Sequence, residues 1–329
     1  MSNKTKRIVF ISSFAVGFLA LLLIGTFLDL QISQSLCVLS EGEYLSTNAF
    51  VLFFEAIGEN VLYLLLGCAV AIIFFYLNNI ANNKLKITLK VVFFIIGLLV
   101  WFYSTQKVME YLAEYMGSTP YLKNIHVVAI EIVVSLLINT LIILAFKNCK
   151  QETINALFKW AIVVIVSAII ANGIVQGIKL FWGRMRYRAM NLIGDTSGFT
   201  PWYSINGKPA LTDEQLLLGL TSDSFKSFPS GHTCAAASLF CLICLPSVLD
   251  KYSNKTSKIL CWTIPTVYTI IVALTRIMCG AHFFTDVLIG GSVCFITTYL
   301  LKWLIIDKNF NPFKKHTKAE NIEEKQTNK

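Results

Sequence analysis

The chain has 329 residues, of which 55% are hydrophobic and only 14% charged, and its mean hydropathy is +0.64. This composition excludes an ordinary soluble domain and is typical of a protein that crosses a membrane several times. The formal net charge is +9. It does not indicate nucleic-acid binding, because most of it follows from the way basic residues are placed between the apolar stretches.

Eight apolar stretches are each close to the ~20 residues that a helix needs to cross the hydrocarbon core. In chain order they are residues 8–30, 60–78, 87–105, 126–146, 157–178, 233–249, 258–275 and 284–306. The first follows basic residues like a signal peptide but is too long for one, so we interpret it as an uncleaved anchor. The sequence therefore predicts an all-α, polytopic membrane bundle of about eight helices.

The basic residues predict the orientation of this bundle. With the N-terminus inside, 19 of the 28 Lys and Arg residues fall on the inner side, and the first outer segment, Gln31–Asn60, has none. Both termini are therefore expected in the cytoplasm. The membrane is expected to be a bacterial cytoplasmic membrane. Seven of the nine outer cations lie between Lys179 and Arg276. Few basic residues are expected on the outer side, so this group of positive charges indicates that a ligand binds there.

Three regions are expected along the chain. Residues 1–150 form an N-terminal four-span block, residues 157–306 hold the chemistry, and the polar residues 307–329 form a disordered cytoplasmic tail. The outer segment Tyr187–Phe228 has 42 residues, which predicts that it is partly folded or functional. Within it, Thr212 to Gln215 is typical of a capping box that opens a short amphipathic helix against the membrane.

The first of three polar clusters is "KLFWGRMRYR", at the outer end of the fifth span. Lys179 and Arg186 are seven residues apart, so a helix continued through them would place both side chains on one face. Taken alone, the cluster fits equally well with basic side chains that extend from a helix end to water.

The second cluster is "PSGH", Pro229 to His232, at the start of the sixth span. Pro229 and Ser230 suit the first turn of a helix, and Gly231 lets a ligand approach the backbone. The free amides of a helix N-terminus favour an anion, and His232 can donate or accept a proton there. A helix cap with an incidental histidine is the alternative.

The third cluster is "TRIMCGAHFFTD", Thr275 to Asp286, between the last two spans. His282 and Asp286 have i, i+4 spacing, so they share a helix face and can hydrogen-bond. A carboxylate on one imidazole nitrogen leaves the other free as nucleophile or base. Arg276 can bind an anion through two hydrogen bonds. Structural pairing is an alternative for His282 and Asp286; metal binding is disfavoured because no further ligand has suitable spacing.

Together the clusters bring three cations, a helix N-terminus and two histidines to the same side of the membrane. This combination suits a phosphate ester, which needs charge neutralisation, a nucleophile and an acid for the leaving oxygen.

The order and spacing of the clusters resemble the signature of the type 2 phosphatidic acid phosphatase superfamily, over residues 157–306. The family pattern is Lys, six residues, Arg-Pro; Pro-Ser-Gly-His; and Ser-Arg, five residues, His, three residues, Asp. This chain has Lys179, Arg186 with Tyr187 in place of the proline, Pro229 to His232, Thr275 in place of the serine, Arg276, His282 and Asp286. Its four preceding spans exceed the two that commonly precede this core.

The resemblance implies a role for each motif residue. Phosphate oxygens would be held by Lys179, Arg186, Arg276, Ser230 and Gly231. His282 would attack phosphorus, Asp286 would orient it, and His232 would protonate the leaving oxygen and then activate water. No metal or other cofactor is implied.

The expected function is hydrolysis of a lipid phosphate or pyrophosphate at the outer face of the membrane, through a phosphohistidine. Phosphatidic acid, phosphatidylglycerophosphate and undecaprenyl pyrophosphate are the candidate substrates; membrane lipids are the only other partners expected. Phosphotransfer to another acceptor is an alternative within the same chemistry. A transporter or flippase is an alternative from another class, but it would need polar or broken helices at mid-membrane.

Overall fold

The computed structural model describes residues 3–117, 124–208 and 211–308, and within these ranges the fold is entirely helical. The α-helices are α1 (Asn3–Leu36), α2 (Ala49–Ile57), α3 (Asn60–Tyr76), α4 (Asn83–Tyr115), α5 (Ile125–Phe146), α6 (Gln151–Trp182), α7 (Tyr187–Ile193), α8 (Asp213–Leu217), α9 (Gly231–Ala237), α10 (Leu245–Val248), α11 (Lys255–Met278) and α12 (Phe284–Leu301). Eight helical segments of the described chain are long and apolar enough to cross a membrane. The predicted all-α membrane bundle is confirmed.

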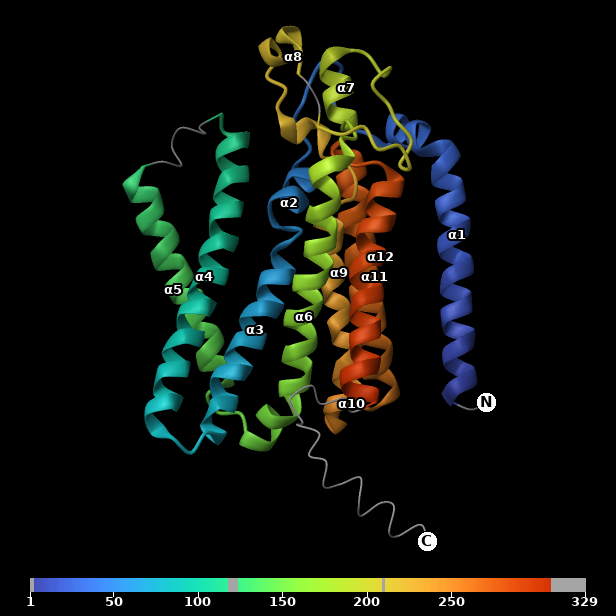
Figure 1. Ribbon diagram of the computed structural model, residues 1–329. Coiled ribbons are helices and arrows are strands. Elements are labelled where there is room, and N and C mark those ends of the chain that lie inside the picture. Colours follow the sequence, from blue (N-terminus) through green and yellow to red (C-terminus); the bar gives the residue numbers. More distant parts are fainter. Residues whose placement is uncertain (1–2, 118–123, 209–210, 309–329) are drawn as a thin grey trace.

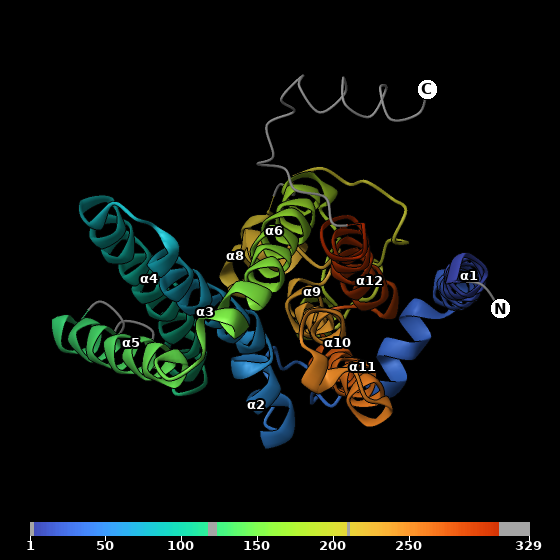
Figure 2. The ribbon, with the colours of Figure 1, turned by 90° about the horizontal axis from the view of Figure 1, so that it is seen from below.

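The helices are arranged in three groups (Figures 1 and 2). In the centre, α6, α9, α11 and α12 pack against one another, and α3 packs on α6. On one side α1 packs against α12, and on the opposite side α4 and α5 form a pair that packs on α3. The end of the bundle opposite the N-terminus carries α7 and α8 (Figure 1).

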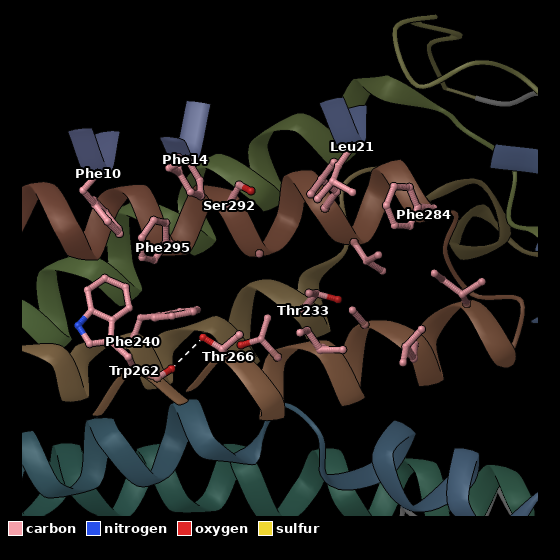
Figure 3. A pocket seen from close by; sticks show the side chains of 18 residues that line it. Phe10, Phe14, Leu21, Thr233, Phe240, Trp262, Thr266, Phe284, Ser292 and Phe295 are labelled. Atoms are coloured by element: carbon pink, nitrogen blue, oxygen red, sulfur yellow. Dashed lines mark hydrogen bonds between the residues drawn. The ribbon is translucent and has the colours of Figure 1, made fainter. Parts of the chain in front are cut away.

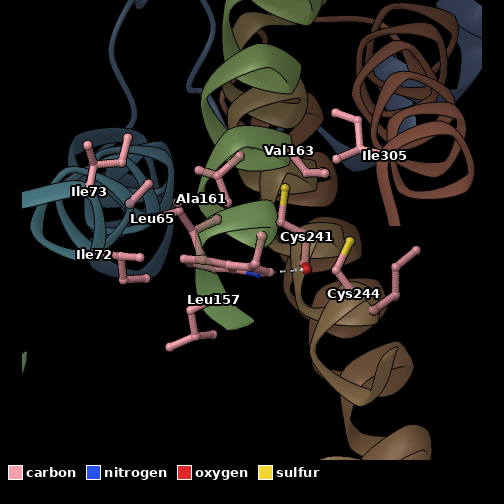
Figure 4. Close-up of a cluster of buried hydrophobic side chains, with 13 residues drawn as sticks. Leu65, Ile72, Ile73, Leu157, Ala161, Val163, Cys241, Cys244 and Ile305 are labelled. Atoms are coloured by element: carbon pink, nitrogen blue, oxygen red, sulfur yellow. Dashed lines mark hydrogen bonds between the residues drawn. The ribbon is translucent and has the colours of Figure 1, made fainter. Parts of the chain in front are cut away.

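One apolar cluster joins α3, α6 and the segment after α9 (Figure 4). Ile72, Ala161 and Cys244 are almost completely buried in it, and Trp160 Nε1 donates to the carbonyl of Cys241 at 3.0 Å. Lipid tails are as apolar as these side chains, so close packing and such hydrogen bonds, more than exclusion of water, hold helices together here.

The segment predicted as the first outer loop, Gln31–Asn60, is partly helical. Asn48 caps α2 by accepting from the amides of Phe50 and Val51, and α2 and α3 together make one candidate span, Ala49–Asn79. Glu55 and Glu59 interrupt the hydrophobic pattern, and sequence periodicity therefore placed this part of the span in a loop.

The sixth span is irregular. Ser230 caps α9, as predicted, but α9 ends at Ala237 and a 3₁₀ segment, Ser238–Cys244, follows before α10. The long outer segment is partly folded, as predicted: it contains α7, α8 and a 3₁₀ turn at Ser222–Phe225.

The predicted capping box at α8 is confirmed, because Thr212 and Gln215 bond reciprocally. The division of the chain into three regions stays a prediction. Nearly all of the expected disordered tail, from residue 309 onward, lies outside the described residues.

Candidate active site

The three predicted clusters meet at one end of the bundle. The Ser230 amide at the start of α9 donates to the Asp286 carbonyl in α12 at 2.9 Å. The absence of a side chain at Gly290 permits this approach, because a Cβ there would lie 2.3 Å from the Ser230 carbonyl oxygen. Lys179 Nζ, near the end of α6, donates to the Lys226 carbonyl at 2.9 Å.

Lys179 and Arg186 do not share a continuous helix, contrary to the sequence prediction. Gly183 ends α6 with a φ of +67°, and a Cβ there would lie 1.9 Å from the carbonyl oxygen of Gly207. Arg186 instead occupies the N-cap position of α7 and is buried. A break in the helix separates the two residues, yet the two cations are close enough to influence one another.

Tyr187, which replaces the family's proline, is the first residue of α7. Proline is favoured at this position because its amide needs no partner there. The helix nevertheless begins at the same place with tyrosine, so Arg186 keeps its capping position.

Arg186 forms an ion pair with Asp223, with 2.9 Å between Nη2 and Oδ2. Burial acts to raise the pKa of Asp223, but the positive charges of Arg186 and Lys179 outweigh it and hold that pKa below its usual range. Asp223 is therefore an anion at neutral pH, placed beside two of the predicted phosphate ligands.

The backbone at Gly231 is open to a ligand. The nearest atom that a Cβ on Gly231 would meet is Gln176 Nε2, 3.8 Å away. Ser230 accepts a hydrogen bond from the Thr233 amide at 3.4 Å and so acts as the helix cap.

His282 is buried, and its contacts differ from those predicted. Its Nδ1 donates to the Ser227 carbonyl at 2.5 Å, whereas Asp286 Oδ2 is 3.8 Å away. Ser227 Oγ donates to the same Asp286 oxygen at 2.5 Å. The Asp286 carboxylate therefore does not accept a hydrogen bond from Nδ1, because Nδ1 already donates to the Ser227 carbonyl. It lies beside the imidazole and is linked to it through Ser227. Nε2 is left as the free nitrogen.

Burial and the charges of Lys179, Arg186 and Arg276 lower the pKa of His282 to about 3, against the opposing effect of Asp286. The imidazole is therefore neutral at physiological pH, which is the form that carries a nucleophilic lone pair.

Asp286 belongs to a buried polar network that sequence reasoning missed. Arg184 Nη1 donates to Asp286 Oδ1 at 2.5 Å, and Arg184 Nη2 donates to Asp29 Oδ2 at 2.8 Å. The Thr285 amide also donates to Asp29 Oδ1 at 2.9 Å. Asp29 comes from α1, so the first helix is tied to the start of α12. Its isolated charge in a long apolar stretch was the available signal.

Arg276 is held by Glu55, a second residue that sequence reasoning missed. Glu55 Oε1 lies 3.0 Å from Arg276 Nη1 and 3.0 Å from Arg188 Nη1. Arg188 also covers the ring of Tyr44, so it has a structural partner on each side. Within the described chain, Arg276 Nε has no hydrogen-bond partner, which leaves it available to an oxygen of a ligand.

His232 is buried and contacts the N-terminal half of the chain. Its Nε2 donates to the Glu55 carbonyl at 3.0 Å and lies 3.3 Å from the Tyr111 hydroxyl. Its Nδ1 lies 3.8 Å from Glu59 Oε2. The site residues predicted from the sequence thus lie at this end of the bundle, and Lys179 and Arg276 influence both His232 and His282.

A separate apolar cavity of about 490 Å³ runs between α1, α9, α11 and α12 (Figure 3). Its lining includes Phe10, Phe14, Trp262 and Phe295. Thr233, the residue after His232, also lines it. Its lining has no charged residue, so its chemistry suits a hydrocarbon chain. Across the described residues, no group of three or more His, Cys, Asp or Glu side chains is arranged to hold a metal ion.

Comparisons with known proteins agree with this geometry. The sequence model of the PAP2 superfamily matches residues 160–310. Phosphatidylglycerophosphatase B from Bacillus subtilis (strain 168) is 34% identical over 83 residues, which are 25% of this chain and 41% of that protein. No solved structure shows significant similarity to this chain. Residues 160–310, which contain all three clusters, are therefore similar to the PAP2 superfamily.

Proposed function

We propose that this protein is an integral-membrane phosphatase that hydrolyses a lipid phosphate or pyrophosphate without a metal ion. The observation that carries the proposal is the meeting of Lys179, Arg186 and Arg276 with two buried histidines at the open N-terminus of α9. The similarity to a phosphatidylglycerophosphatase supports the reaction class. The neighbouring apolar cavity lies within the range of volumes typical of ligand sites, which fits a substrate with a hydrocarbon tail.

In the first step, Nε2 of His282 bonds to phosphorus while the bond from phosphorus to the leaving oxygen breaks. Protonated His232 gives its proton to that oxygen, so the alcohol or phosphate leaves neutralised. Lys179, Arg186 and Arg276 stabilise the charge on the three other oxygens. In the second step His232 takes a proton from water, the water oxygen bonds to phosphorus, and the bond to His282 breaks.

Release of inorganic phosphate by the purified protein tests this function. Phosphatidic acid, phosphatidylglycerophosphate and undecaprenyl pyrophosphate would each be incubated with it in EDTA, without an added acceptor. We expect phosphate from at least one of them, inhibition by vanadate as a mimic of five-coordinate phosphorus, and no release by His282→Ala.

Three outcomes would contradict the proposal. Release that stops in EDTA and returns with magnesium would indicate a metal-dependent reaction. Turnover only with an added alcohol or phosphate acceptor would indicate a phosphotransferase. Absence of turnover with all three lipids, combined with movement of labelled lipid across vesicles, would indicate a flippase.

We also propose that the site faces outward and both termini face the cytoplasm. Arg184, Arg186, Arg188 and Arg276 carry much of the outer positive charge, and all are buried; they therefore serve internal ion pairs or a ligand. Single cysteines at Ser204 and Asn254, in a background without the native cysteines, should be labelled from outside and inside respectively. Labelling of both from one side would reject this topology.

A further inference from the structure

The Nδ1 atom of His232 is the nitrogen that gains and loses the catalytic proton. Its Nε2 lies 3.0 Å from the Glu55 carbonyl, and because a carbonyl only accepts, Nε2 carries a hydrogen in the neutral ring. The free lone pair is therefore on Nδ1. The side chain facing Nδ1 is Glu59, whose Oε2 is 3.8 Å away.

The surroundings of His232 create a need for a negative charge. Arg276 and Lys179 act on it electrostatically from α11 and α6, and like charges disfavour the imidazolium that an acid catalyst requires. His282 also lies near it, in the turn before α12, but is neutral. Tyr111, from α4, adds a polar but uncharged contact at Nε2. Near Glu59 itself, Lys107 and Glu110 carry opposite charges and pair with each other at 2.7 Å.

The two carboxylates of this wall have different partners. Glu55 pairs with both Arg276 and Arg188, so its negative charge is already balanced by these two cations. Glu59 is the N-cap residue of α3, and its side chain makes no capping hydrogen bond there. It is the carboxylate available to His232.

The turn that carries Glu59 is fixed in space. It joins α2 to α3 at Gly58, and Tyr268 of α11 donates to the Gly58 carbonyl at 3.0 Å. Residues from α3 and α11 thereby set the distance between Glu59 and His232. A separation of 3.8 Å is longer than a hydrogen bond, and such catalytic contacts often tighten only when substrate binds.

We propose that Glu59 is a positioning residue that keeps the proton on Nδ1 of His232 for the acid step, which rests on the proposed phosphatase function. This role requires Glu59 to act as a carboxylate and not to exchange the proton itself: the Nδ1 proton goes to the leaving oxygen, and the proton from water returns to Nδ1. This region precedes the catalytic core, so the N-terminal half of the chain contributes to the chemistry.

The test measures the pH dependence of kcat/KM for Glu59→Gln with an alkyl lipid phosphate and with an activated aryl phosphate. We expect kcat/KM for the alkyl ester at pH 7 to fall by roughly 10- to 100-fold. The alkaline limb of its pH profile should move to lower pH by about 1–3 units, because the imidazolium loses its countercharge. The aryl ester, whose leaving oxygen needs little protonation, should lose much less. Phosphoenzyme formation from it should persist.

Glu110→Gln is the matched control, because it removes the same charge from a neighbouring glutamate that pairs with Lys107 and not with His232; its profile should match wild type. If Glu59→Gln does not fold, Glu59→Asp keeps the charge on a shorter side chain and should shift the limb by a smaller amount. An unchanged alkaline limb, or equal losses for both esters, would overturn the role of Glu59. An inactive wild-type protein would instead overturn the proposed function.

Discussion

The two histidines of the site are supported by different parts of the molecule. His282 is held by neighbours from the C-terminal half of the chain, namely Ser227 and Asp286, with Arg184 behind them. His232 is held by Glu55 and Tyr111, which lie 177 and 121 residues before it. The three sequence clusters contain Asp286, a neighbour of His282, but none of these neighbours of His232. The surroundings of His232 therefore depend on how the N-terminal region packs.

The largest expected effect separates the histidines themselves. His282→Ala should reduce turnover by roughly 10⁴- to 10⁶-fold and remove the acid-labile phosphoenzyme, because the attacking nitrogen is gone. His232→Ala should cost roughly 10²- to 10⁴-fold with an alkyl ester and less with an aryl ester. Trapping of labelled phosphate, beside steady-state rates, checks both. A normal phosphoenzyme in His282→Ala would reverse the assignment.

The next effect tests whether the support of His282 is also structural. Arg184→Gln leaves Asp29 and Asp286 buried without their cation, and breaking a buried ion pair typically costs about 3–5 kcal/mol of stability. Denaturant titration in detergent measures this loss. Adding Asp29→Asn should restore part of it, since one unpaired charge is removed. Equal stability of wild type and Arg184→Gln would show that the ion pairs of Arg184 with Asp29 and Asp286 do not stabilise the fold.

The smallest effect concerns pH. An unfolded histidine binds a proton near pH 6.5, whereas His282 in the folded protein does so only at about pH 3. Between these values the unfolded state binds more protons, so stability falls as the pH is lowered. From pH 7 to pH 5 the contribution of His282 falls by about 2 kcal/mol. The loss of unfolding free energy from pH 7 to pH 5 should therefore be smaller in His282→Ala than in the wild type. An equal loss in the two proteins would contradict a neutral, buried imidazole.

Sequence patterns predicted the parts of this protein that depend on local order. The spans follow from hydropathy, and Ser230 and Thr212 cap their helices because capping needs only adjacent residues. The continuous helix between Lys179 and Arg186 was wrong, since the close approach of Gly207 to Gly183 is a tertiary contact.

The same reason explains why Glu55, Glu59 and Asp29 were missed. Each is a single charge in or beside an apolar stretch, and its partner lies more than a hundred residues away in sequence. Periodicity treats such a charge as the edge of a span. Only the folded chain shows which arginine or histidine lies beside each carboxylate.

The bond between Asp29 and Thr285 also sets an order for biosynthesis. The two residues are 256 positions apart, and at a synthesis rate of about 5–20 residues per second the partner is made roughly 10–50 s after Asp29. Arg184, the other partner of Asp29, follows it by 155 positions and is made earlier than Thr285. The contacts of the first helix with the start of α12 therefore complete only after nearly the whole chain has been made.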